Sequence, residues 1–123
     1  LSVAGLEPRP SRAQNRPMTD HPQWLYAFLP GPRPELATDP AAWTEEDERI
    51  ADRHFAYLQQ ALADGVLVVA GRSQDGIGPA IVVFEAPDEA SAREFMNGDP
   101  FVANGLFDAS LHPYRTALIR GRP

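Results

Sequence analysis

Two side chains in this sequence have the chemistry and the setting for proton transfer. His54 lies within an apolar repeat at helical spacing, four residues after Ile50 and four before Leu58, so we expect its imidazole to point into the interior. The residues expected to form this apolar stripe of one helix are Ile50, Tyr57, Leu58, Ala61 and Leu62. Asp99 precedes Pro100, and a residue before proline favours an extended backbone. A carboxylate beside an imidazole fixes its tautomer and raises its basicity, which makes a general acid/base pair.

A structural interpretation of the same two residues stays open. In it, His54 is a hydrogen-bonded core histidine and Asp99 caps a helix. The other two histidines are weaker candidates. His21 precedes the first predicted strand, where a terminal side chain is usually solvated, and His112 lies in the last predicted strand, where it could face either a pocket or a dimer interface.

The residue types exclude several other kinds of site. The chain has no cysteine, which excludes disulfides, thiolate metal sites and cysteine nucleophiles. All 11 basic residues are arginine, so there is no lysine for Schiff-base chemistry. No second histidine stands at metal-ligand spacing from His54, and no glycine-rich phosphate loop is present. We therefore expect neither a metal nor a cofactor.

Charge and hydropathy limit the partners. The net charge is -6 over 123 residues, which argues against nucleic acid because phosphate binding depends on basic side chains. No apolar run approaches the length of a membrane span, and no secretory signal is visible. We expect a soluble, cytoplasmic protein that binds a small molecule.

The chain divides into a proline-rich tail over residues 1–22, expected to be flexible, and one domain over residues 23–120. The predicted strands are 23–29, 66–72, 79–86 and 106–119, and the predicted helices are 43–65 and 88–97, with a single further turn at 101–105. The order β-α-β-β-α-β is that of the ferredoxin-like α+β fold, an antiparallel sheet with both helices on one face. The first three strands are apolar on both faces, so we expect a homodimer or a higher homo-oligomer, and a homodimer paired through the bare face is the economical way to cover it.

Local signals mark the ends of the helices. Thr44 is a good N-cap with Asp47 at the capping-box position, and Gly65 suits the residue after the helix. Asp88 is the predicted N-cap of the second helix. Between the first strand and the first helix, the prolines of residues 30–40 predict a long extended loop, which could form a lid over a site.

The sequence resembles the YCII-related (YciI-like) family over residues 23–119. The segments that carry the resemblance are His54-Phe55-Ala56-Tyr57-Leu58, Asp64-Gly65-Val66-Leu67, and Gly98-Asp99-Pro100-Phe101 with the residues up to Leu106. The resemblance implies a dimeric α+β barrel of ferredoxin-like chains and a catalytic His–Asp pair, which carries over to His54 and Asp99. A relative with the fold that this resemblance implies eliminates chloride from a chlorinated hydroquinone without a metal or an organic cofactor. The loop over residues 30–40 and the amino-terminal tail depart from the family pattern.

The sequence supports two hypotheses about function. In the first, the protein is a cofactor-independent lyase or isomerase acting on a small aromatic or enolisable molecule, in which His54 moves the proton and Asp99 orients the ring. Its predicted pocket residues are Tyr26, Arg53, Gly71 and Phe101. In the second, the domain binds a small ligand or supports assembly without catalysis, and the same pair is structural.

Overall fold

The computed structural model describes residues 22–121. Residues 1–21 of the predicted tail, with His21 among them, lie outside the described residues. The strands are β2 (Gln23–Pro30), β3 (Leu67–Arg72), β4 (Ala80–Glu85) and β5 (Phe107–Tyr114). The helices are α1 (Glu45–Ala63), α2 (Glu89–Gly98) and α3 (Pro100–Ala103), with two short 3-10 helices, η1 (Pro34–Ala37) and η2 (Pro40–Ala42). Over this part of the chain, every helix is too short or too polar to cross a membrane.

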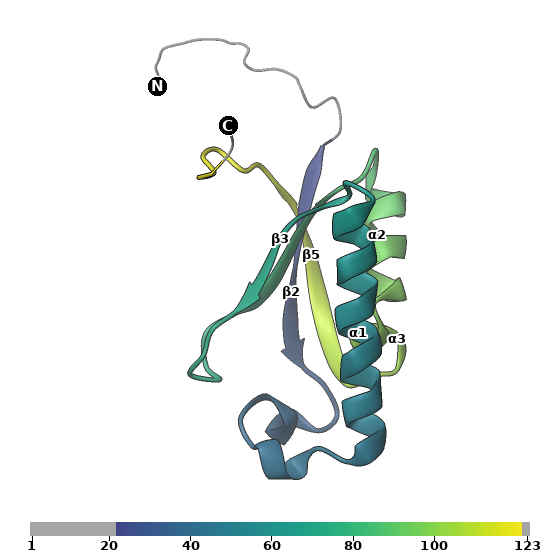
Figure 1. Cartoon of the computed structure of the whole chain (residues 1–123), viewed down its shortest axis with the longest axis vertical. Helices are drawn as coiled ribbons and strands as arrows, with labels where there is room; N and C mark the ends of the chain where they lie inside the picture. Colours follow the sequence, from purple (N-terminus) through teal and green to yellow (C-terminus); the bar gives the residue numbers. More distant parts are fainter. Residues whose placement is uncertain (1–21, 122–123) are drawn as a thin grey trace, which may run out of the picture.

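The four strands form one antiparallel sheet in the order β3-β4-β2-β5. Helices α1 and α2 lie on the same side of this sheet (Figure 1). This arrangement confirms the predicted ferredoxin-like β-α-β-β-α-β fold. Pro113 lies in β5, whose place at the end of the strand order leaves one side unpaired among the described residues, as expected for a proline within a strand.

The caps that the sequence predicts for α1 are all present. The hydroxyl of Thr44 accepts from the backbone N–H of Asp47, and the Asp47 carboxylate accepts from the N–H of Thr44. Gly65 follows the helix with a positive φ of 77°, a conformation that favours glycine. These caps fix where α1 begins, and they therefore fix the directions in which Ile50 and His54 point from the helix.

One residue of the predicted apolar stripe of α1 lies elsewhere. Ile50, Leu58 and Ala61 are buried, but Leu62 is exposed. At 100° per residue, Leu62 stands roughly 120° around the helix from Ile50, whereas Ala61 stands only about 20° away. The expectation for Leu62 was wrong because this residue belongs to a second side of the helix, above the edge strand β3.

Two other expectations about the chain are corrected. The proline-rich loop is not simply extended, since it contains η1 and η2 and buries Leu36. A proline opens each 3-10 helix, where its fixed φ and its missing N–H are acceptable. The last strand ends at Tyr114 rather than at residue 119, because the residues beyond it make no further ladder with β2.

Side chains alternate between the two faces of the sheet. Trp24, Tyr26 and Phe28 of β2 pack in the core between the sheet and the helices. Leu25 and Ala27 point the other way, together with Ile81 and Val83 of β4, which lie opposite them in the ladder. The second face is therefore apolar at its centre, as the sequence predicted. The core itself consists of Tyr26, Leu58, Val82, Phe84, Ala86, Ala92 and Met96.

Candidate active site

His54 lies midway along α1 on the side that faces the sheet and α3. It is separated by one helical turn from Ile50 and by another from Leu58, and both of these are buried. The His54 side chain keeps 16% of its surface exposed. It is therefore an interior side chain that remains partly open to solvent.

Asp99 is fully buried, at 0% exposure, in the break between α2 and α3. Its backbone is extended, with φ -61° and ψ 125°, as the following proline requires. Its side chain caps α3, since Oδ1 accepts from the backbone N–H of Phe101 at 2.9 Å. Asp99 therefore does serve as a cap, as the structural interpretation of the sequence expected.

The same carboxylate also contacts the imidazole. His54 Nδ1 lies 2.7 Å from Asp99 Oδ1, and the hydroxyl of Tyr26 donates to Oδ2 at 2.8 Å. Three hydrogen bonds thus converge on one carboxylate, from β2, α1 and the start of α3. Capping and pairing are not alternatives here, because the capping oxygen is the one that contacts the ring.

This geometry determines which nitrogen of the ring is free. An ionised carboxylate can only accept hydrogen bonds, and Tyr26 and the N–H of Phe101 already donate to Asp99. We therefore assign the hydrogen to His54 Nδ1, which leaves the lone pair on Nε2. Among residues 22–121, Asp99 is the only hydrogen-bond partner of the His54 ring.

Two tyrosines near the pair remain protonated at neutral pH. Burial is the main cause that raises the pKa of Tyr26 far above its usual range, and the charge of Asp99 adds to it. Burial also raises the pKa of Tyr57 to about 12, with a smaller contribution from Asp99. Tyr26 is therefore a permanent donor to Asp99 rather than an acid or base itself.

Aromatic rings surround the imidazole. Phe101 stacks on His54 with centroids 4.0 Å apart and planes 20° apart, and the edge of Phe28 meets it at 5.7 Å. Trp43 and Phe107 contact Phe101 in turn, at 6.0 Å and 5.1 Å. The ring of His54 is thus held in one orientation by flat apolar surfaces, which are also suited to a planar ligand.

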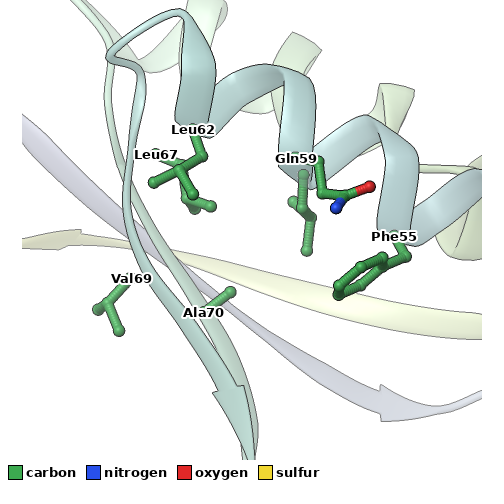
Figure 2. A pocket seen from close by; sticks show the side chains of 7 residues that line it. Phe55, Gln59, Leu62, Leu67, Val69 and Ala70 are labelled. Carbon is green, nitrogen blue, oxygen red and sulfur yellow. The ribbon is translucent and has the colours of Figure 1, made fainter.

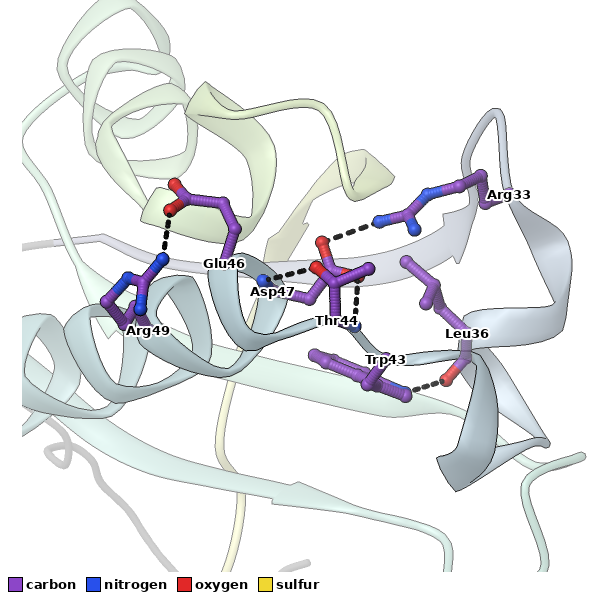
Figure 3. A network of polar contacts seen from close by, with 7 residues as sticks. All are labelled: Arg33, Leu36, Trp43, Thr44, Glu46, Asp47 and Arg49. Atoms are coloured by element: carbon purple, nitrogen blue, oxygen red, sulfur yellow. Dashed lines mark hydrogen bonds and ion pairs between the residues drawn. The ribbon is translucent and has the colours of Figure 1, made fainter.

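The proline-rich loop forms the far side of this aromatic cluster. Arg33 pairs with the buried carboxylate of Asp47 at 2.6 Å, and the indole N–H of Trp43 donates to the carbonyl of Leu36 at 3.0 Å. Figure 3 shows both contacts where the loop meets the start of α1. Hydrogen bonds from Arg33 and from the Thr44 backbone hold the pKa of Asp47 below its usual range. The loop is therefore fastened to the helix that carries His54.

The predicted pocket residues are found in different places. Phe101 lies against His54, and Tyr26 lies under the pair, fully buried. Arg53 is exposed on α1, about 100° around the helix from His54. The sequence predicted Tyr26 as a pocket residue but not its hydrogen bond to Asp99. Because the first strand is apolar on both faces, alternation along the strand did not reveal which face Tyr26 occupies.

Gly71 and His112 lie on the other side of the sheet. Gly71 pairs with Ile81, which pairs with Ala27, so it belongs to the face that points away from the helices. His112 is exposed, and its Nε2 lies 3.0 Å from Ser110 Oγ. In the part of the chain that the structure describes, no group of three or more histidine, aspartate or glutamate side chains is placed to hold a metal ion.

The fold and the site together define the class of protein, which is a ferredoxin-like domain with an interior His–Asp pair. The chain belongs to the YCII-related domain family, whose sequence profile matches residues 25–111. A comparison with curated proteins finds no match.

The fold is also found among solved structures. The chain is similar to the structure of 5-chloro-2-hydroxyhydroquinone dehydrochlorinase (TftG) from Burkholderia phenoliruptrix AC1100, in complex with 2,5-dihydroxybenzoquinone. The TM-score is 0.56 at 20% sequence identity, over 76% of this chain and 93% of that one. At this identity the similarity shows a common fold.

Proposed function

We propose that the protein is an acid/base enzyme of the lyase or isomerase type, acting on a small aromatic or enolisable molecule through His54 and Asp99. The single observation that carries the proposal is the contact of 2.7 Å between Asp99 Oδ1 and His54 Nδ1. It leaves Nε2 as a base on a ring that remains partly exposed. Such a pair can move a proton with no further group taking part.

The proposed reaction begins when Nε2 removes a proton from a hydroxyl or an activated carbon of the substrate. The electron pair left behind forms a new double bond. In an elimination this expels a leaving group together with its bonding pair, and in an isomerisation the proton returns at a different atom. Asp99 keeps the ring oriented and stabilises the imidazolium that forms, as the carboxylate of a catalytic triad does.

The surroundings of the pair support an aromatic substrate. Phe28 and Phe101 already place flat apolar surfaces beside the imidazole, and a planar ring can extend such a stack. The structurally similar dehydrochlorinase is named for a chlorinated hydroquinone and was solved with a dihydroxybenzoquinone. A cytoplasmic location and the binding of a small ligand remain part of this proposal.

The experiment is a screen of halogenated hydroquinones and enolisable ketones, read as halide release and as deuterium uptake from heavy water. We expect His54→Gln to lower turnover at least a hundredfold, on the scale of a lost general base. His112→Gln is the matched control, because this exposed histidine lies on the opposite sheet face, and it should keep full activity. Equal losses in the two variants would contradict the proposal.

The alternative is a ligand-binding or assembly domain in which the pair is structural, favoured by the additional role of Asp99 as the cap of α3. In that case His54→Gln should lower the melting temperature by several degrees, as the loss of a buried hydrogen bond does. Binding of a hydroquinone, measured by calorimetry, would then persist without turnover in the parent chain.

A further inference from the structure

A pocket of about 360 Å³ lies between α1 and the edge strand β3. Its lining is apolar except for one glutamine, and Figure 2 shows Phe55 of the helix and Ala70 of the strand pointing into it. Phe55 directly follows His54 in the chain. Two residues after Ala70 comes Arg72, the last residue of β3. The pocket therefore borders both the turn of α1 that carries His54 and the part of β3 that ends in Arg72.

The strand ladder fixes the face of the sheet on which Arg72 lies. Ala70 pairs with Val82, and Val82 pairs with Tyr26, which belongs to the core beneath the helices. Because successive side chains of a strand alternate between the faces, Arg72 lies on the same face as Ala70. Arg72 is therefore on the side of the sheet that faces α1, the helix that carries His54.

Arg72 also shares a row across the sheet with Phe28, whose ring meets the imidazole of His54 at 5.7 Å. Arg72 pairs with Ala80 of β4, and continuing the register of β2 and β4 by one position places Phe28 on the other side of Ala80. The backbones of Phe28 and Arg72 are therefore two strand spacings apart, or about 10 Å. The side chain between them is only a methyl group, which leaves room above it for one planar ring.

The guanidinium of Arg72 has no ion pair or hydrogen bond within residues 22–121. In this part of the chain the arginine ion pairs are those of Arg33, Arg49 and Arg93, each with its own carboxylate. The Arg72 side chain is exposed, so its charge is available to a ligand. Guanidinium groups bind carboxylates through two parallel hydrogen bonds, and a carboxylate is therefore the group that Arg72 suits best.

The surroundings of His54 would otherwise repel an acidic ligand. Asp99 places a carboxylate beside the imidazole, and the chain as a whole carries a net charge of -6. An anionic group near the pair therefore needs a compensating positive charge. Arg72 offers this charge on the far side of Ala80, which would keep the acidic group of a ligand away from Asp99.

We propose that Arg72 determines specificity by binding a carboxylate, so that the substrate is a small aromatic or enolisable acid. This inference rests on the proposed function, because it assigns the other end of the molecule on which His54 acts. The ring of the substrate lies over Ala80, its carboxylate pairs with Arg72, and the atom that loses a proton faces His54. Arg72 itself takes no part in the proton transfer.

Hydroquinone and 2,5-dihydroxybenzoate test this assignment, because the two rings differ only in one carboxylate. Their dissociation constants are measured by calorimetry for the parent chain, for Arg72→Gln and for Arg115→Gln. We expect the parent to bind the acid about tenfold more tightly than hydroquinone, on the scale of a hydrogen bond to a charged group. Arg72→Gln should lose this preference and keep the affinity of the parent for hydroquinone.

Arg115→Gln is the matched control, because it removes one exposed arginine at the other end of the sheet. Arg115 follows Tyr114, which pairs with Gln23 at the end of β2 that is remote from Phe28. This variant should keep the full preference for the acid. A preference that survives in Arg72→Gln, or that falls equally in both variants, would overturn the proposal.

The same binding data separate this proposal from the proposed function. A parent chain that binds the two rings equally would overturn the role of Arg72 and leave proton transfer by His54 standing. A parent chain that binds neither ring would overturn both the role of Arg72 and the aromatic substrate class.

Ala80→Leu tests where the ring lies. The larger side chain would fill the space between Phe28 and Arg72, so both rings should bind several-fold more weakly than to the parent. Unchanged affinities for the two rings would mean that the ligand lies elsewhere, which also overturns the proposal.

Discussion

The carboxylate of Asp99 serves three groups in the molecule at once. It caps α3 through Phe101, accepts from Tyr26 and contacts His54. A buried carboxylate is costly unless its oxygens are hydrogen-bonded, and here both oxygens have donors. The helix cap therefore stabilises the same charge that orients the imidazole, so local structure and proposed chemistry depend on one residue.

Tyr26→Phe tests the support beneath the pair. The change removes the donor to Asp99 Oδ2 while keeping the ring, so a fully buried oxygen loses its partner. We expect a loss of about 1–3 kcal/mol in the free energy of unfolding, measured by urea denaturation. Tyr114→Phe is the control, because Tyr114 lies exposed at the end of β5. Equal stability of the two variants would contradict the role assigned to Tyr26.

At the scale of elements, the loop between β2 and α1 is packed rather than open. Leu36 is buried with Ile50 and Leu106, and Trp43, Phe101 and Phe107 pack against them. The loop therefore supports the ring that stacks on His54. A lid that opens freely would have to break the Arg33–Asp47 pair and expose this cluster.

The ion pair between Arg33 of the loop and Asp47 of α1 predicts that the stability of the fold falls in acid. The pKa of Asp47 is lowered in the folded chain, first by its hydrogen bond with Arg33. Its contribution to stability is therefore present above its unfolded pKa of about 3.9 and is lost as the pH falls through the folded pKa. Arg33→Gln should lower the melting temperature at neutral pH. The difference from the parent should begin to shrink near about pH 4 and vanish only once the pH lies below the folded pKa of Asp47.

Arg49→Gln is the matched control for this thermal titration. Arg49 pairs with Glu46 on the exposed surface of the same helix, and such pairs contribute little to stability. Its melting temperature should follow that of the parent at every pH. If the Arg33→Gln difference were the same at acid and neutral pH, the contact with Asp47 would not be its cause.

The sequence predicted those features that depend on neighbouring residues. The capping box of Thr44 and Asp47, the cap at Asp88 and the turn at Gly65 are each set within a few residues. The contact between Arg33 and Asp47 crosses 14 positions in the chain, and no local pattern reports such a pairing. The same limit applies to Tyr26 and Asp99, which are 73 positions apart.

The position of Leu62 shows a different limit. Apolar spacing predicts which residues of a helix lie together but not how wide a stripe the core will cover. The core accepts Ile50, Leu58 and Ala61, and it ends before Leu62. Leu62 instead lines a pocket between α1 and the edge strand β3, so its exposure depends on where that strand lies and not on the pattern of the helix.

For the whole molecule, the apolar sheet face predicts a homodimer. Leu25, Ala27, Ile81 and Val83 share the face without helices, and a charge at its centre should prevent two sheets from stacking. Ile81→Arg is expected to convert a species of twice the chain mass into a monomer, measured by light scattering. Ile77→Arg at the exposed hairpin should leave the mass unchanged, and a parent that is monomeric at high concentration would contradict this expectation.

The tautomer of His54 is the most direct test of the central claim, that Asp99 holds Nδ1 and leaves Nε2 as the base. Long-range nitrogen–proton NMR at mildly alkaline pH reports which nitrogen of each neutral ring carries the hydrogen. We predict hydrogen on Nδ1 of His54, with the exposed His112 as the reference in the same spectrum. Hydrogen on Nε2 of His54 would contradict the account, because the nitrogen proposed to accept the substrate proton would already carry one.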